Sequence, residues 1–150
     1  ETMYQAVHHQ FIGCAKIKEF AKEIDPEAHI GTMIAEGCVY PKTCNPKDVV
    51  GAMKRNRVQE YFFTDTQLRG EYPTYMLRHF EEKGIHIHFE DGDEKLLKNN
   101  TMDFLVIVIT IQMYLITKQI QEYHFKSEQN PYLKPTPWEW RADHLDSIIV

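Results

Sequence analysis

F-L-V-I-V-I-T-I, residues 104–111, is the stretch that decides the fold, because it is the strongest strand signal in the chain. Its β-branched residues favour a pleated strand. A second apolar run at 30–35, I-G-T-M-I-A, is short and punctuated by glycine, as expected of a strand that is buried on both faces. Ser147–Val150 has the pattern of a strand that is just beginning.

Helical patterns separate these strands. Residues 3–24 predict an amphipathic helix, which Asp25-Pro26 ends, because proline pushes the preceding residue out of the α region. Its apolar residues recur at spacings of three and four, and we expect them to form the stripe that faces the core: Val7, Phe11, Cys14, Ile17, Ala21 and Ile24.

Further helices are marked by their ends. Asn45-Pro46 is an N-cap followed by proline, which predicts a helix to about Arg57. A second helix begins at Pro73 and stops at Gly84. Three weaker assignments follow: one or two helical turns at 91–98, a helix at 118–125, and an extended loop at 130–140. Strands that alternate with helices predict an α/β fold with parallel pairing, here as a single domain over residues 1–150.

Composition excludes several classes of protein. The net charge of −5 and the absence of a Lys/Arg run give no reason to expect nucleic acid. The most apolar stretch, 104–116, is shorter than the ~20 residues of a membrane-spanning helix and contains Thr110 and Gln112. The three cysteines favour a reduced, cytoplasmic setting, while a Cys38–Cys44 bridge stays open as an alternative.

The first residues, Glu1-Thr2-Met3-Tyr4, lack a signal-peptide pattern and an initiator methionine, so we expect an internal piece of a longer protein. A closed eight-fold βα barrel needs about 250 residues, more than the 150 present.

Histidines invite a metal hypothesis. His86 and His88 lie two residues apart, Asp91 and Asp93 follow, and imidazole with carboxylate suits zinc. The alternative, which we favour, is a solvated strand edge at 86–88, with His8 and His9 on different faces of their helix. We therefore assign no metal ligand and no cofactor.

Five blocks of sequence carry a resemblance to one group of enzymes. They are Y-Q-A-V-H-H (4–9), V-Y-P-K-T-C-N-P-K-D-V (39–49), Y-F-F-T-D-T-Q-L-R-G-E-Y-P (61–73), T-M-D-F (101–104) and N-P-Y-L-K (130–134). Together they resemble the 6-phospho-β-glucosidases of glycoside hydrolase family 1, which are (β/α)-barrel enzymes. The resemblance implies a partial (β/α) barrel with few parallel strands, running from the helix after barrel strand four to just before strand seven.

The resemblance also implies a chemistry whose key residues this chain lacks. The family hydrolyses glycosides with retention, through one glutamate in a Thr-x-Asn-Glu motif and another in Thr-Glu-Asn-Gly. Neither motif occurs in the 150 residues, so we assign no catalytic residue. The family pattern Ser-Phe-Ser-Tyr-Tyr is replaced by Val106–Thr110, and the Trp-Gly-Trp stretch has drifted at Trp138–Ser147.

Aromatic and charged residues supply the remaining candidates. By resemblance, Trp140 lies near an aglycone-contacting tryptophan of the family, and Trp138 offers a second sugar-binding face; packing of the loop is the alternative. Asp65 and Arg69 are expected to fix loop geometry by ion pairing and capping rather than to bind substrate.

Two functions follow from the sequence. The first is a segment or shortened relative of a 6-phospho-β-glucosidase, whose substrate is a phosphorylated β-glucoside and which is inactive in the form of this chain alone. The second is a non-catalytic α/β module that forms homo-oligomers or binds a partner through exposed strand edges, with residues 104–111 as the candidate for pairing with a second copy.

Overall fold

The computed structural model describes residues 1–109, 113–116, 126–129 and 147–149. These residues fall into two compact units. The first unit contains residues 1–32 and 62–105, and the second contains residues 33–61 and the described part of 106–149. The expectation of a single domain over 1–150 stays a prediction.

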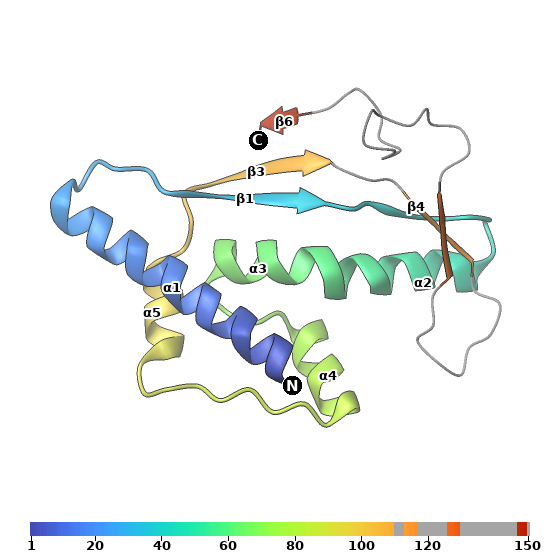
Figure 1. Ribbon diagram of the computed structural model, residues 1–150, viewed down its shortest axis with the longest axis horizontal. Helices are drawn as coiled ribbons and strands as arrows, with labels where there is room; N and C mark the ends of the chain where they lie inside the picture. Colours follow the sequence, from blue (N-terminus) through green and yellow to red (C-terminus); the bar gives the residue numbers. More distant parts are fainter. Residues whose placement is uncertain (110–112, 117–125, 130–146, 150) are drawn as a thin grey trace. The chain divides into compact units, whose positions relative to one another are not determined.

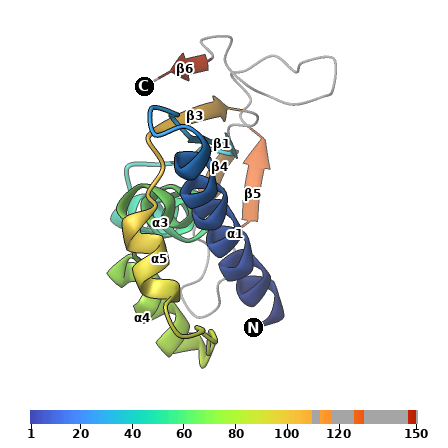
Figure 2. The same cartoon turned by 90° about the vertical axis from the view of Figure 1, so that its left-hand side faces the viewer.

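Four helices build the first unit: α1 (Thr2–Ile24), α3 (Phe62–Arg69), α4 (Thr74–Lys83) and α5 (Asp93–Asn99). α1 and α5 lie side by side (Figure 1 and Figure 2). The predicted helix ends are confirmed, since α1 gives way to Asp25 and α4 stops at Gly84 in the left-handed conformation. Residues 85–90, however, form no strand, so the expected strand edge at 86–88 is absent.

An aromatic cluster forms the core of this unit. Phe62 is almost wholly buried, and its ring lies 5.3 Å from that of Phe11, 5.2 Å from Tyr72 and 6.0 Å from Phe80. All three pairs are edge-to-face, the geometry that aromatic rings prefer. The block at 61–73, to which the sequence assigned no helix, thus supplies α3 and the centre of the core.

Gly70 shows why the turn after α3 requires glycine. Its φ is +69°, a conformation that side chains with a Cβ rarely adopt. A Cβ built there would lie 2.5 Å from the carbonyl oxygen of Leu97 and 2.7 Å from Cα of Lys98. The Arg-Gly pair therefore lets α3 end directly against the backbone of α5.

An ion pair between a buried lysine and an exposed aspartate joins α1 to the segment before the next strand. Lys18 Nζ lies 2.6 Å from Asp103 Oδ1 and also donates to the carbonyl oxygen of Thr101. Asp103 Oδ2 accepts from the backbone N–H of Ile30 at 2.8 Å. The Thr-Met-Asp-Phe block is therefore a structural tie between distant parts of the chain.

The prediction for the buried face of α1 is wrong. The buried residues are His8, Phe11, Ile12, Ala15 and Lys18, whereas Ile17 and Ile24 are exposed. Polar His8 and Lys18 are buried because Asp93 and Asp103 provide partners for them. Phe11 is the one member of the expected stripe that is fully buried.

The second unit contains α2 (Pro46–Asn56), the π-helical turn η1 (Arg57–Tyr61) and the strand β2 (Val39–Pro41). Val39 and Ala52 form a small apolar core between β2 and α2. The Asn56 side chain accepts from the N–H of Val39 at 3.1 Å and donates to its carbonyl oxygen at 2.9 Å. The Asn56 side chain of α2 thus binds both backbone groups of Val39 in β2.

Two three-stranded sheets are present among the described residues. The first has the order β1-β3-β6, from β1 (Gly31–Glu36), β3 (Phe104–Ile109) and β6 (Ser147–Ile149). The second has the order β2-β4-β5, with β4 (Met113–Ile116) and β5 (Lys126–Gln129). The strands predicted at 30–35, 104–111 and 147–150 are confirmed as β1, β3 and β6, while β2, β4 and β5 were not predicted.

Parallel pairing holds for only part of these sheets. β1 and β3 run in the same direction (Figure 1), and β2 pairs with β4 in parallel. β3 with β6 and β4 with β5 are antiparallel. Residues 117–125, which join β4 to β5, are fewer than the dozen or more that a parallel crossover needs. The helix predicted at 118–125 lies outside the described residues, as does the loop at 130–140.

Candidate functional site

The carboxyl end of β1 carries a chain of hydrogen-bonding groups within the second unit. Glu36 is the last residue of the strand, Cys38 follows, and Tyr40 lies in β2. The Cys38 thiol donates to the Glu36 carboxylate, and the Tyr40 hydroxyl donates to the sulfur. Burial and the negative charge of Glu36 raise the pKa of Cys38 to about 11, so the thiol stays protonated and is a poor nucleophile.

Glu60, on the π-helical turn, completes this cluster. Burial raises the pKa of its carboxyl group, and the charge of Glu36 adds to that effect. A hydrogen bond from the backbone of Gly37 and the charge of Arg55 act in the opposite direction without cancelling it. The pKa of Tyr61 is raised as well, chiefly by burial. A carboxyl group whose pKa is raised is the type of group that enzymes use as a general acid.

Sequence reasoning did not find the cluster of Glu36, Cys38, Tyr40 and Glu60. One signal was available, because barrel enzymes place their functional residues at the carboxyl ends of strands. Glu36 comes directly after the predicted strand at 30–35. Glu60 gave no signal, since π-helical turns have no sequence pattern, although they are frequent at functional sites.

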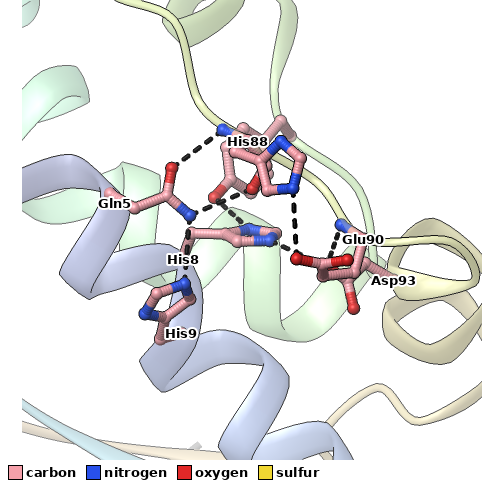
Figure 3. A network of polar contacts seen from close by, with 7 residues as sticks. Gln5, His8, His9, His88, Glu90 and Asp93 are labelled. Carbon is pink, nitrogen blue, oxygen red and sulfur yellow. Dashed lines mark hydrogen bonds and ion pairs between the residues drawn. The ribbon is translucent and has the colours of Figure 1, made fainter.

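A second polar network, centred on His8, lies in the first unit (Figure 3). His8 Nε2 lies 3.1 Å from Asp93 Oδ2, and its Nδ1 lies 3.0 Å from the hydroxyl of Tyr72. The backbone N–H of Glu90 also donates to Asp93 Oδ2, at 2.8 Å. Burial, with the charge of Asp93, raises the pKa of Tyr72, so its hydroxyl stays neutral.

Asp93 remains ionised in this network. Burial acts to raise its pKa, but hydrogen bonds from Glu90 and His8 outweigh burial and lower it. Only 1% of His8 and 9% of both Tyr72 and Asp93 is exposed. The Tyr–His–Asp chain resembles a catalytic relay in outline, but its burial makes it a structural link among α1, the α3–α4 connection and α5.

Gln5 extends the network to the segment before α5. Its side chain donates to the carbonyl oxygen of His88 at 3.0 Å and accepts from the His88 N–H at 2.8 Å (Figure 3). Gln5 Nε2 also lies 3.1 Å from His9 Nε2, and His88 Nε2 lies 3.1 Å from Glu90 Oε1. The Tyr-Gln-Ala-x-His-His block is thereby explained as a set of structural ties.

In the part of the chain that the structure describes, no three His, Cys, Asp or Glu side chains lie close enough together to bind a metal ion. His86 and His88 are exposed, while His8 and His9 project from different sides of α1. Cys14, Cys38 and Cys44 are free thiols, so Cys38 and Cys44 form no bridge.

A cavity of about 590 Å³ opens beside this network. His9 and Lys16 of α1 line one side, and Glu90, Asp91 and Asp93 line the other. Glu90 is paired with His88, and Asp93 with His8. Because the pKa of Asp93 is lowered, this carboxylate is unsuited to donate a proton near neutral pH.

The charged pair in the block at 61–73 forms the ion pair that the sequence predicts. Arg69 Nε lies 3.2 Å from Asp65 Oδ1, and the Tyr75 hydroxyl donates to Asp65 Oδ2 at 2.8 Å. The ion pairing is confirmed, although both residues lie within α3 rather than in a loop or at a cap.

The Thr-Cys-x-Pro-x-Asp block is the N-terminal cap of α2. Asn45 Oδ1 accepts from the N–H of Lys47 at 3.0 Å. Thr43 accepts from the N–H of Asn45 and donates to Asp48 Oδ2 at 2.6 Å. The bond to Asn45 satisfies one free N–H group of the first turn, and Thr43 ties the N-cap residue to Asp48. Trp138 and Trp140, by contrast, lie outside the described residues, so their sugar contact stays a prediction.

The fold and these blocks define a part of an α/β glycosidase barrel, and comparison with known proteins agrees. Residues 1–147 match the family Glycosyl hydrolase family 1. The chain therefore belongs to glycoside hydrolase family 1.

Named relatives refine this assignment. The chain is 40% identical to the aryl-phospho-beta-D-glucosidase BglH of Bacillus subtilis, over 95% of this chain and 31% of that protein. It is 37% identical to the 6-phospho-beta-glucosidase AscB of Escherichia coli, over 100% of this chain and 32% of that protein. The chain thus spans about a third of the length of the curated relatives that it matches.

Solved structures give the same fold. The beta-glucosidase of Exiguobacterium antarcticum matches 91% of this chain with 31% of its own, at a TM-score of 0.74 and 23% identity. The beta-glucosidase of Exiguobacterium marinum matches with a TM-score of 0.73, at the same identity and coverage. The partial barrel that the resemblance implies is confirmed. Within the described residues, no helix combines the length and apolarity that crossing a membrane requires.

Proposed function

We propose that the chain is a segment or a shortened relative of a 6-phospho-β-glucosidase, which in its whole form hydrolyses cytoplasmic 6-phospho-β-glucosides with retention and without a cofactor. The proposal rests on a difference in sequence identity between relatives whose names include a phosphate and one whose name does not. Identity is 40% with a phospho-glucosidase over 95% of the chain, but 25% over 69% with the beta-glucosidase A of Acetivibrio thermocellus, whose name carries no phosphate.

The chain alone does not turn over a glycoside under this proposal. A retaining enzyme needs two carboxyl groups about 5–5.5 Å apart, one a proton donor and the other a free nucleophile. The family's two glutamate motifs do not occur in the sequence. Of the acids at the end of β1, Glu36 accepts a hydrogen bond from Cys38, and Glu60 accepts one from Gly37. Neither acid lies in a Thr-x-Asn-Glu or a Thr-Glu-Asn-Gly motif.

The test is incubation of the purified chain with p-nitrophenyl 6-phospho-β-D-glucoside, with BglH of Bacillus subtilis as the positive control. We expect release of nitrophenol at the rate of the buffer blank. Release above the blank that co-purifies with the chain through two further columns contradicts the proposal.

Substrate contact through Trp138 and Trp140 is a separate part of the proposal. Indole rings present broad apolar faces that suit the faces of a sugar ring. Glucose 6-phosphate is titrated into the chain while tryptophan fluorescence is recorded, with Trp138→Phe and Trp140→Phe as single variants. We expect a saturable change that is lost mainly in the Trp140 variant. A flat trace for the parent chain removes these residues from the proposal.

A second candidate is a non-catalytic module that associates with itself through strand edges. β3, the strand expected to pair with a second copy, lies between β1 and β6 and is therefore not an edge. Among the described residues β1 stands at one end of the order β1-β3-β6, and an edge strand leaves backbone N–H and C=O groups without strand partners. Met33, Phe104 and Val108 on these strands are also exposed. Sedimentation velocity at tens of micromolar tests this function: a concentration-dependent dimer supports it, and a monomer throughout the range excludes it.

A further inference from the structure

The cavity beside the His8 network is bounded on one side by a single stripe of α1. The members of the stripe share one helical face, because they follow one another at spacings of three, one and three residues: His9, Ile12, Gly13 and Lys16. The other side is formed by His88, residues 90–93 and Leu96 of α5. All of these residues belong to the first unit. At about 590 Å³, the cavity has the size of a small-molecule site.

Gly13 leaves the middle of this stripe without a side chain. Glycine in the interior of a helix lowers the stability of the helix relative to alanine, so its presence calls for a reason. Close packing does not supply that reason, because a Cβ added at Gly13 would meet nothing within 4 Å. The missing side chain instead leaves open space in the wall of the cavity.

Asp93 contributes to this cavity a buried carboxylate with one oxygen unused. The residue is only 9% exposed and lines the cavity. Its side chain accepts hydrogen bonds from the N–H of Glu90 and from His8, and both bonds go to Oδ2 (Figure 3). No donor in the described part of the chain bonds to Oδ1. Buried polar atoms normally have a partner, so Oδ1 indicates a donor that a ligand brings.

The charges around the cavity indicate the sign of that ligand. Asp91 is exposed, and its carboxylate has no hydrogen bond or ion pair with another described residue. Glu90 is paired with His88, and the charge of Lys16 acts on Asp93. Three carboxylates therefore face one lysine, and the cavity attracts a positive charge. A metal ion does not fit, since no three metal-binding side chains gather among the residues that the structure describes.

We propose that this cavity binds a small organic amine in its ammonium form, which donates to Asp93 Oδ1, is held by the charge of Asp91, and rests its apolar part on Ile12 and Leu96. An ammonium group supplies both the donor and the positive charge that the cavity lacks. The site goes beyond the proposed glycosidase function and does not rest on it, because it shares no residue with the cluster at the end of β1.

The probe is hexylammonium, and hexanol and hexanoate are its neutral and anionic counterparts of equal length. Each compound is titrated into the whole isotope-labelled chain, and amide NMR spectra follow the signals of Gly13 and Gly92. We expect hexylammonium to shift both signals saturably, with a dissociation constant in the millimolar range, and hexanol to bind about tenfold more weakly. The absence of saturable shifts, or binding of hexanol or hexanoate as tight as that of hexylammonium, overturns the inference.

Charge variants test the two charged walls separately. Asp91→Asn should weaken hexylammonium binding about tenfold, whereas Lys16→Met should strengthen it several-fold because it removes a repelling charge. Glu94→Gln is the matched control, since it removes one negative charge from an exposed residue of α5 that does not line the cavity. It should change binding less than about twofold, because solvent screens its charge. Equal effects of Asp91→Asn and Glu94→Gln, or weaker binding by Lys16→Met, would overturn the inference.

Variants at Gly13 test the location of the site. Gly13→Leu places a bulky side chain in the open space, whereas Gly13→Ala adds only a methyl group and serves as its control. Both replace a glycine within the helix, so neither should lower the urea midpoint of the chain. We expect Gly13→Leu to abolish the hexylammonium shift of Gly92 and Gly13→Ala to keep it. A Gly92 shift that persists in folded Gly13→Leu would overturn the inference.

Discussion

Replacement of Gly70 by alanine tests the packing of α3 against α5. Alanine at a φ of +69° costs about 1–2 kcal/mol, because the left-handed region crowds Cβ. The new Cβ would also lie 2.5 Å from the Leu97 carbonyl oxygen, and the neighbouring atoms are all backbone, so α5 itself must shift. Overpacking of this type costs roughly 1–3 kcal/mol more. We expect Gly70→Ala to destabilise the first unit by about 2–5 kcal/mol in total.

Gly84 supplies the control for the backbone contribution. It has a φ of +61°, close to that of Gly70, but an added Cβ would meet nothing within 4 Å. Gly84→Ala should therefore cost only the conformational part, about 1–2 kcal/mol. Urea denaturation of both variants, followed by far-ultraviolet circular dichroism, measures the difference. Equal losses of stability for the two variants would show that α5 does not lie against Gly70, and would refute the packing described here.

Three further predictions concern local chemistry. Asn45→Ala should reduce stability by about 1 kcal/mol through loss of the α2 cap, and Asn45→Asp, which keeps the acceptor, should recover most of it in urea denaturation; equal losses would contradict the cap. Glu36→Gln should lower the pKa of Cys38 from about 11 toward its ordinary value, measured by thiolate absorbance in a Cys14→Ser, Cys44→Ser background; an unchanged pKa would show that Glu36 does not act on the thiol. The hydrogen bonds from Lys18 and from the backbone N–H of Ile30 lower the pKa of Asp103 in the folded state. The contribution of the Asp103 carboxylate to stability is therefore fully present above about pH 4, and it is lost as the pH falls through the lowered pKa. Asp103→Asn should flatten that dependence in urea midpoints measured from neutral pH to below about pH 3; the same slope in both proteins would assign the dependence to other carboxylates.

The sequence predicts helix ends well because the signals are local. Asn45 caps a backbone N–H two residues away, and Gly84 adopts the left-handed conformation whatever lies elsewhere in the chain. The strand at 104–109 is similarly predictable, since β-branched residues favour it directly.

The buried face of α1 could not be predicted in this way. The expected apolar stripe shares only Phe11 with the buried face, because polar His8 and Lys18 turn inward. Their partners, Asp93 and Asp103, are each 85 positions further along the chain. A pattern read within one helix cannot contain such contacts, and a polar residue counts against burial until its partner is known.

The candidate site, too, could be predicted only in part from the sequence. The blocks that identified the family proved to be caps, ties and packing contacts, as with Thr43 and Asp48 at the start of α2. The cluster at the end of β1 joins Glu36 to Glu60 across 24 positions and a π-helical turn. Neither residue spacing nor composition predicts that Glu36 and Glu60 lie near each other.

The most direct single measurement is hydrolysis of p-nitrophenyl 6-phospho-β-D-glucoside by the chain beside its Glu36→Gln and Glu60→Gln variants. We predict that all three proteins release nitrophenol at the rate of the blank, because the family's acidic pair is missing from this sequence. Turnover by the parent chain that disappears in both variants would contradict this reasoning, and would identify the carboxyl groups at the end of β1 as a catalytic pair.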